Sequence, residues 1–231
     1  MVQIDCKDKH ITEINKAIKA GLTSDGEVVV VNPGSRHNLG VGINQPGKLT
    51  FEGNVGYFCG GMLKQADIVV HGNCGWSVGS DMMSGSIVVH GNASAAAGAA
   101  IRGGLLVVHG NAGPRTGISM KGGTIVIGGN VDYMSGFIMQ KGVFIICGNT
   151  GEALGDSMYQ GRIFVRGKIA EQGNDAVEKA MDEADKTLLT ELLTKYQVAG
   201  IPKPEEFKKI VSGEQLYNFS IKDFELWRVA L

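Results

Sequence analysis

A glycine returns every nineteen residues through the middle of the chain, and this spacing limits the fold more than any other feature of the sequence. Further glycines recur seven residues after six of the leading glycines, from Gly60 to Gly155, and thirteen residues after six of them, from Gly47 to Gly161, where Ala66 is the one interruption. The leading glycines are Gly34, Gly53, Gly72, Gly91, Gly110, Gly129, Gly148 and Gly167. The sequence therefore predicts one structural unit that is copied seven times.

Each unit carries a run of mostly β-branched residues at the same place, as in Ile68-Val69-Val70 and Ile87-Val88-Val89. Such runs are typical of strands that are covered on both faces. A βαβ crossover needs about thirty residues per unit, and the segments between these runs are short and glycine-rich, so a doubly wound sheet is excluded. We predict an all-β fold, a right-handed parallel β-helix of about seven nineteen-residue coils that rise about 4.8 Å each.

Other positions of the unit also repeat. An asparagine follows six of the leading glycines. Asparagine tolerates left-handed backbone geometry and can hydrogen-bond to the identical residue on the next coil, so these residues are predicted to form an amide ladder. They are Asn54, Asn73, Asn92, Asn111, Asn130 and Asn149. An apolar column is predicted to face the bore: Leu63, Met82, Ile101, Met120, Met139 and Met158. The residues that follow it are predicted to point outward, as a strand requires.

The chain divides into three predicted segments. Residues 1–26 form an N-terminal cap with a short helix at residues 11–20, in which Thr12 is the N-cap and Gly21 ends the helix. Residues 27–168 form the β-helix and begin with a strand at residues 27–31. Residues 169–231 form a helical tail, with one helix at residues 182–198 and a shorter one from Pro204. Aromatic residues near the C-terminus are predicted to pack on the coil or on a partner: Tyr217, Phe219, Phe224 and Trp227.

Composition excludes several classes of function. The formal net charge is −1, which gives no basic field, so nucleic acid is not an expected partner. The sequence has neither a long apolar run nor a signal peptide, so we expect no membrane span and a cytoplasmic protein. The four cysteines show no metal-ligand spacing and are expected to be structural thiols in a reducing compartment. They are Cys6, Cys59, Cys74 and Cys147.

Three patterns invite comparison with known kinds of site. His71, His90 and His109 share one column, but stacked rings point side by side, whereas zinc needs nitrogens that converge on one point. The Gly-Asn-x-Gly runs lack the helix that a phosphate-binding loop requires. We therefore predict no catalytic, cofactor-binding or metal-ligating residues. Corner residues such as Tyr57 and Trp76 form either an exposed docking strip or a cover on the coil itself.

The nineteen-residue Gly-Asn coils over about residues 27–168 resemble the GXGXG β-helix domain of the glutamate synthase large subunit. They also resemble two stand-alone relatives, which are the β-helix subunits of methylamine-glutamate N-methyltransferase (N-methylglutamate synthase) and of formylmethanofuran dehydrogenase. The glutamate-synthase-like type is the more similar in four segments. These are Asn32-Pro33-Gly34 with His37-Asn38-Leu39, Gly56 to Met62, Gly117 to Gly122, and Leu154 to Ser157.

The resemblance implies a non-catalytic scaffold subunit in nitrogen metabolism. It would hold a glutaminase-type amidotransferase subunit against an FMN-barrel synthase subunit, in a complex that forms glutamate or N-methylglutamate. This chain would bind no cofactor, and FMN and an iron-sulfur cluster would lie on a partner subunit. Two alternatives stay open: the β-helix subunit of a formylmethanofuran dehydrogenase complex, and a self-assembling structural β-helix protein, which would form a homo-oligomer.

Overall fold

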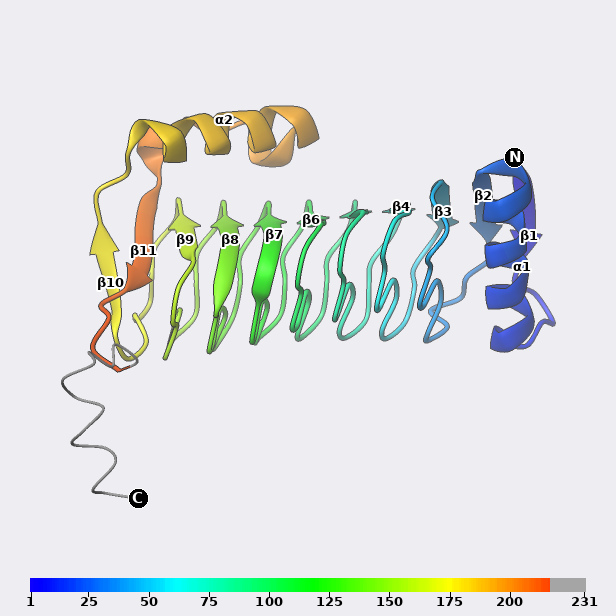
Figure 1. Cartoon of the computed structure of the whole chain (residues 1–231), viewed down its shortest axis with the longest axis horizontal. Helices are drawn as coiled ribbons and strands as arrows, with labels where there is room; N and C mark the ends of the chain where they lie inside the picture. Colours follow the sequence, from blue (N-terminus) through cyan, green and yellow to red (C-terminus); the bar gives the residue numbers. More distant parts are fainter. Residues whose placement is uncertain (217–231) are drawn as a thin grey trace, which may run out of the picture.

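The computed structural model describes residues 1–216, and these form a β-solenoid of about seven turns (Figure 1). One mostly parallel sheet runs the length of this part of the chain, in the order β1-β2-β3-β4-β5-β6-β7-β8-β9-β11-β10. The parallel strands are β1 (Val2–Asp5), β2 (Glu27–Val31), β3 (Lys48–Glu52), β4 (Asp67–Val70), β5 (Ser86–Val89), β6 (Leu105–Val108), β7 (Lys121–Ile127), β8 (Lys141–Ile146) and β9 (Arg162–Val165). The predicted β-helix is confirmed, while the right-handed sense of the coil stays a prediction.

The register of the sheet follows the nineteen-residue repeat. Val69 pairs with Val88, and Val88 pairs with Val107 on the next strand. From β3 to β9 the frame slips once, where Lys121 pairs with Lys141 and a bulge follows before Thr124 pairs with Val143. β2 and β3 pair with an offset of 21 residues, as in Val28 with Leu49. Identical positions therefore stack along the solenoid axis, as the sequence predicts.

The recurring glycines serve two physical purposes. A Cβ atom on Gly91 would lie 2.6 Å from the carbonyl oxygen of Gly72, so the leading glycines allow close stacking of coils. Gly98, seven residues further on, has a φ of +65°, a conformation that glycine adopts without strain.

Non-glycine residues also take positive φ at two further corners, for example Phe58 at +60° and Met62 at +56°, which the sequence did not predict. Hydrogen bonds between coils, such as Phe58 N–H to the Trp76 carbonyl at 2.7 Å, hold these residues in place.

The asparagine ladder is present. The Oδ1 atom of Asn54 accepts the backbone N–H of Asn73 at 2.8 Å, and the same bond repeats from coil to coil until Asn149 accepts from Lys168. None of the six asparagines has a positive φ, so the ladder does not use the left-handed geometry that asparagine tolerates. Each side-chain oxygen reaches the backbone N–H of the following coil, and the side chains lie exposed at the corner.

The bore holds the apolar column that the sequence predicts. Leu63, Met82 and Ile101 are fully buried, as are the methionines that follow them, and the next residue of each coil is exposed. The inward strand residues complete this core, for example Ile68 and Val70 on β4.

The N-terminal cap consists of β1 and helix α1 (Ile11–Asp25). The predicted N-cap, Thr12, is wrong, because the N-cap is His10. The ring nitrogen Nδ1 of His10 accepts the Thr12 N–H at 3.3 Å, and the Glu13 carboxylate accepts the His10 N–H at 3.2 Å. Gly21 does not end the helix, which continues to Asp25 and closes at Gly26 with a φ of +71°. Instead, Gly21 allows close packing, since a Cβ atom there would lie 2.7 Å from a Val28 methyl group.

The C-terminal segment differs more from the prediction. Helix α2 (Glu183–Tyr196) is confirmed, but β10 (Ala176–Lys179) precedes it, and β11 (Lys208–Ser212) follows a single turn at Pro204–Glu206 where a helix was expected. β11 pairs antiparallel with both β9 and β10. Ile210 at its centre is buried in the core, whereas its two neighbours are only half-buried. The predicted packing of the C-terminal aromatic residues concerns positions outside the described residues.

Helix α2 lies along the solenoid beside β6 to β9 (Figure 1). Its Leu189 and Leu193 pack on the outward residues of those strands and form a second core with Val107, Val126, Ile145 and Phe164. The outward Val69 and Val88, on β4 and β5, are only half-buried, and Val88 packs at the edge of this second core. Strands β6 to β9 are therefore buried on both faces, and β4 and β5 on one.

Candidate functional site

The histidine column forms the predicted stack. The ring centroids of His71 and His90 are 4.8 Å apart and those of His90 and His109 are 5.0 Å apart, with interplanar angles of 10° and 7°. Burial and the neighbouring His90 lower the pKa of His109. Nε2 of His71 lies 4.0 Å from a Glu52 carboxylate oxygen. The ring nitrogens thus lie side by side along the solenoid, and none of the described residues forms a cluster of three metal-binding side chains.

Aromatic side chains form an exposed row at a different corner. The rings of His37 and Tyr57 stack at 4.2 Å, and those of Tyr57 and Trp76 stack at 5.5 Å. Tyr57 is 47% exposed, Trp76 56% and Tyr133, further along the row, 44%. Of the two interpretations open from the sequence, the structure supports the exposed strip. We call His37, Tyr57, Trp76 and Tyr133 the aromatic strip.

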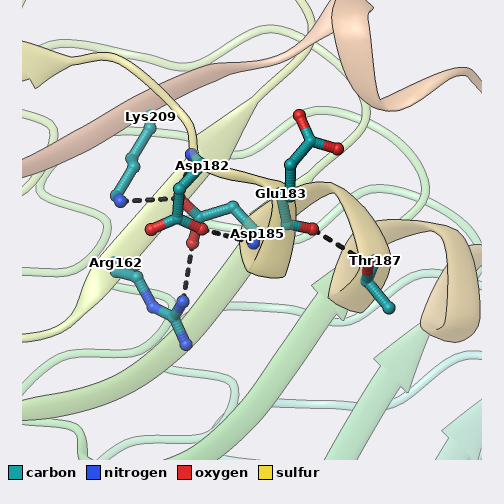
Figure 2. A network of polar contacts seen from close by, with 6 residues as sticks. All are labelled: Arg162, Asp182, Glu183, Asp185, Thr187 and Lys209. Carbon is teal, nitrogen blue, oxygen red and sulfur yellow. Dashed lines mark hydrogen bonds and ion pairs between the residues drawn. The ribbon is translucent and has the colours of Figure 1, made fainter.

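A buried carboxylate joins three elements at the C-terminal end of the coil (Figure 2). The Asp185 side chain is completely buried at the start of α2 and accepts a hydrogen bond of 2.6 Å from Nη1 of Arg162 on β9. Its other oxygen accepts a bond of 2.6 Å from Nζ of Lys209 on β11. Asp182, the N-cap, accepts the Asp185 backbone N–H at 2.9 Å. This network fixes the start of α2 to the last coil.

The charge balance of this network explains its protonation state. Burial alone would raise the pKa of Asp185, but hydrogen bonds from Lys209, from the Asp182 backbone and from Arg162 outweigh it, so the pKa lies below its usual value of 3.8. The carboxylate is therefore charged at neutral pH. The sequence shows one sign of this network, which is an aspartate three residues after an N-cap. The cationic partners of Asp185 lie 23 and 24 residues away along the chain, so the sequence does not reveal them.

The cysteines lie inside the molecule rather than at a site. All four are free and buried, and burial raises the pKa of Cys59 and of Cys147 to about 12.

Neither helix within residues 1–216 is long and apolar enough to cross a membrane.

These features define a β-solenoid that is capped at both ends and has an exposed aromatic strip. No protein-family model matches the chain, and no curated protein matches it. One similar solved structure is a chain of the formyltransferase/hydrolase complex FhcABCD from Methylorubrum extorquens, determined in complex with methylofuran. The two chains are 21% identical, the match covers 87% of this chain and 86% of the other, and the TM-score is 0.66. The likeness at this level of identity concerns the fold.

Proposed function

We propose that this chain is a non-catalytic scaffold subunit of a glutamate-synthase-like complex. It holds a glutaminase-type amidotransferase subunit against an FMN-containing synthase subunit, and the complex forms glutamate or N-methylglutamate. The observation that carries the proposal is the aromatic strip, in which the rings of His37, Tyr57 and Trp76 are stacked and exposed on adjacent coils. Tyrosine and tryptophan supply much of the binding energy at protein interfaces.

The solenoid suits a docking role for an energetic reason. Binding orders side chains and loops, and each ordered side chain opposes association by about 0.5–1.5 kcal/mol. In this chain, hydrogen bonds to the next coil hold the corner backbone, for example Tyr57 N–H to His37 Nδ1 at 2.9 Å, and ring stacking holds the side chains. The strip is therefore ordered before a partner arrives, which lowers the ordering cost.

A second candidate follows from the structural comparison. A solenoid chain of similar extent, matched over 86% of its length, belongs to the FhcABCD formyltransferase/hydrolase complex. This favours the formylmethanofuran-related alternative, in which the chain is a scaffold subunit of a complex that handles formyl groups. Both candidates give the chain the same task and differ in the partner chains.

Co-expression with the products of neighbouring genes, followed by purification through a tag on this chain, tests the proposal. Mass photometry and mass spectrometry would then identify the assembly. Amidotransferase and FMN-barrel chains support the first candidate, whereas formyltransferase and hydrolase chains support the second. Failure to assemble with either set contradicts the scaffold role, as does flavin absorbance or glutamine turnover by the purified chain alone.

Substitutions in the strip locate the docking surface. Tyr57→Ala combined with Trp76→Ala should weaken assembly at least tenfold, because it removes two adjacent exposed rings. Met83→Ala is the matched control, since Met83 is 44% exposed at another corner. Equal assembly of both variants would place the interface elsewhere.

A further inference from the structure

Three cationic side chains lie one above another on consecutive coils. Lys121 and Lys141 are register partners on β7 and β8, and the Lys121 N–H bonds at 2.7 Å to the carbonyl of Ile101, the residue before Arg102. Arg102, Lys121 and Lys141 are all exposed. We call these three residues the basic ridge, and its members lie about 4.8 Å apart from one coil to the next.

The basic ridge has no neutralising partner within the described part of the chain. No carboxylate of residues 1–216 forms an ion pair with any of its three side chains, whereas Arg162 and Lys209 share Asp185 and Arg166 pairs with Glu206. Like charges on directly opposed residues destabilise a sheet. The stacking of these cations therefore gives the isolated chain no stability.

The middle coils are almost free of carboxylates. Asp132 is the only one of the 23 acidic residues that lies between Met82 and Gly151, and its Oδ1 atom accepts the Tyr133 N–H at the corner that carries the aromatic strip. The formal net charge of −1 thus combines a basic middle, a nearly neutral N-terminal part and an acidic C-terminal part. A ligand at the basic ridge meets positive charge only over a short length of the solenoid.

Glycines keep the surface beside the basic ridge open. A hollow of about 330 Å³ is lined by Lys141, Arg162 and the glycines Gly122, Gly123, Gly142 and Gly161. A Cβ atom on Gly122 would collide with the carbonyl oxygen of Arg102. Close stacking of the coils therefore requires glycine here, and the lack of side chains leaves room beside the cations.

We propose that the basic ridge docks a short acidic segment of a partner subunit, whose carboxylates pair with Arg102, Lys121 and Lys141. The inference rests on the proposed function, because it gives the chemistry of a partner surface. Charged hydrogen bonds to carboxylates would satisfy all three cations. A long polyanion fits less well, because the positive charge is confined to the middle coils and the acidic C-terminal part repels it.

A peptide titration tests the chemistry directly. The probe is a fluorescein-labelled octapeptide of alternating Glu and Ser, with the Gln-Ser peptide as its neutral counterpart, followed by anisotropy in 50 mM and 500 mM NaCl. The variant R102Q/K121Q/K141Q should bind the acidic peptide at least tenfold more weakly than wild type. The control K7Q/K9Q/K16Q removes the same charge from exposed positions at the N-terminal end and should stay within twofold of wild type. Melting curves check that both variants are folded.

Three results of the titration would overturn the inference. They are an equal loss in the control variant, no binding of the acidic peptide by wild type in 50 mM salt, and tighter binding of a labelled 15-nucleotide RNA than of the peptide. Binding that does not weaken in 500 mM salt would also contradict it, because exposed charges are screened at that concentration.

The assembly experiment separates this inference from the proposed function. If the triple ridge variant loses a partner subunit that the control variant retains, the basic ridge is a docking surface. If it assembles as wild type does, the inference is wrong while the scaffold role stands. If wild type itself does not assemble, the scaffold role is wrong, and the titration alone decides whether the ridge binds acidic segments.

Discussion

The six asparagines of the ladder use their side-chain oxygens as acceptors for backbone N–H groups of the following coil. In the middle of the ladder, Asn92 Oδ1 accepts the Asn111 N–H at 2.8 Å, and Asn73 Oδ1 accepts that of Asn92 at the same distance. The side chains are exposed, so water can replace a lost acceptor in part. Each of these hydrogen bonds therefore adds a modest amount to the free energy of unfolding, and the same contribution recurs at every coil of the ladder.

Asn92→Ala should lower the free energy of unfolding by about 1 kcal/mol, the usual net value of one such hydrogen bond. Urea unfolding followed by circular dichroism measures it. Asn44→Ala is the control, because Asn44 is also exposed but lies outside the ladder. Equal midpoints for the two variants would show that the ladder does not contribute to stability.

Gly91→Ala should destabilise more, by about 2–3 kcal/mol, because its Cβ atom would meet the Gly72 carbonyl oxygen at 2.6 Å and force the coils apart. Gly26→Ala serves as the comparison, since its φ is +71° but no atom lies within 4 Å of an added Cβ. That variant should lose only about 1 kcal/mol from its left-handed backbone. A larger loss at Gly26 than at Gly91 would contradict the close-stacking explanation.

The sequence predicts the inward and outward columns because a strict repeat fixes which residues stack. It does not predict the backbone at corners such as Phe58 and Met62, where residues other than glycine have positive φ. The reason is that hydrogen bonds between coils, rather than the intrinsic preference of those residues, set the local geometry.

Helix α2 is the element whose attachment depends most on a few contacts. Its first turn is held by Asp185, and its buried face by Leu189 and Leu193. The apolar spacing of this segment predicts the helix, but no local signal predicts β10 and β11. β11 forms by pairing with β9 at the open edge of the coil, and β10 forms by pairing with β11. Both are tertiary effects.

Asp185→Asn should reduce the free energy of unfolding by about 3 kcal/mol, the low end for breaking a buried ion pair, because Arg162 is 37% exposed and keeps part of its hydration. Hydrogen exchange should show α2 opening before the coil does. Glu183→Gln is the control, since that carboxylate is 88% exposed and its pair with Lys186 lies at the surface, so its unfolding midpoint should change little. Similar exchange in α2 of both variants would contradict an anchoring role.

The difference between wild type and Asp185→Asn should also depend on pH. The pKa of Asp185 is lowered in the folded state from 3.8, so its contribution is fully present above about pH 4 and is lost as the pH falls through the lower folded value. Unfolding curves should therefore show a constant difference from pH 7 to pH 5 and a shrinking one below pH 4. A difference that shrinks already at pH 6 would contradict this assignment.

On the scale of the whole molecule, the cysteines report whether the solenoid opens. Cys59 and Cys147 are buried, with a pKa of about 12, so almost no thiolate forms at pH 8. The folded protein should react with a thiol reagent over hours, the denatured protein should react at four thiols at once, and the variant Ser84→Cys should react within minutes at its exposed corner. Labelling of all four native thiols within minutes would show an open bore.

The strict register also sets the length of this molecule in whole steps. Since Val88 pairs with Val107 and Val107 with Val126, removal of residues 91–109 would restore every column and shorten the sheet by one strand, about 4.8 Å. Loss of half that number would bring core residues to the surface. Deletion or insertion of whole coils would therefore change the distance between two partners bound at different coils only in steps of about 4.8 Å. The number of coils thus sets the spacing of the bound partners.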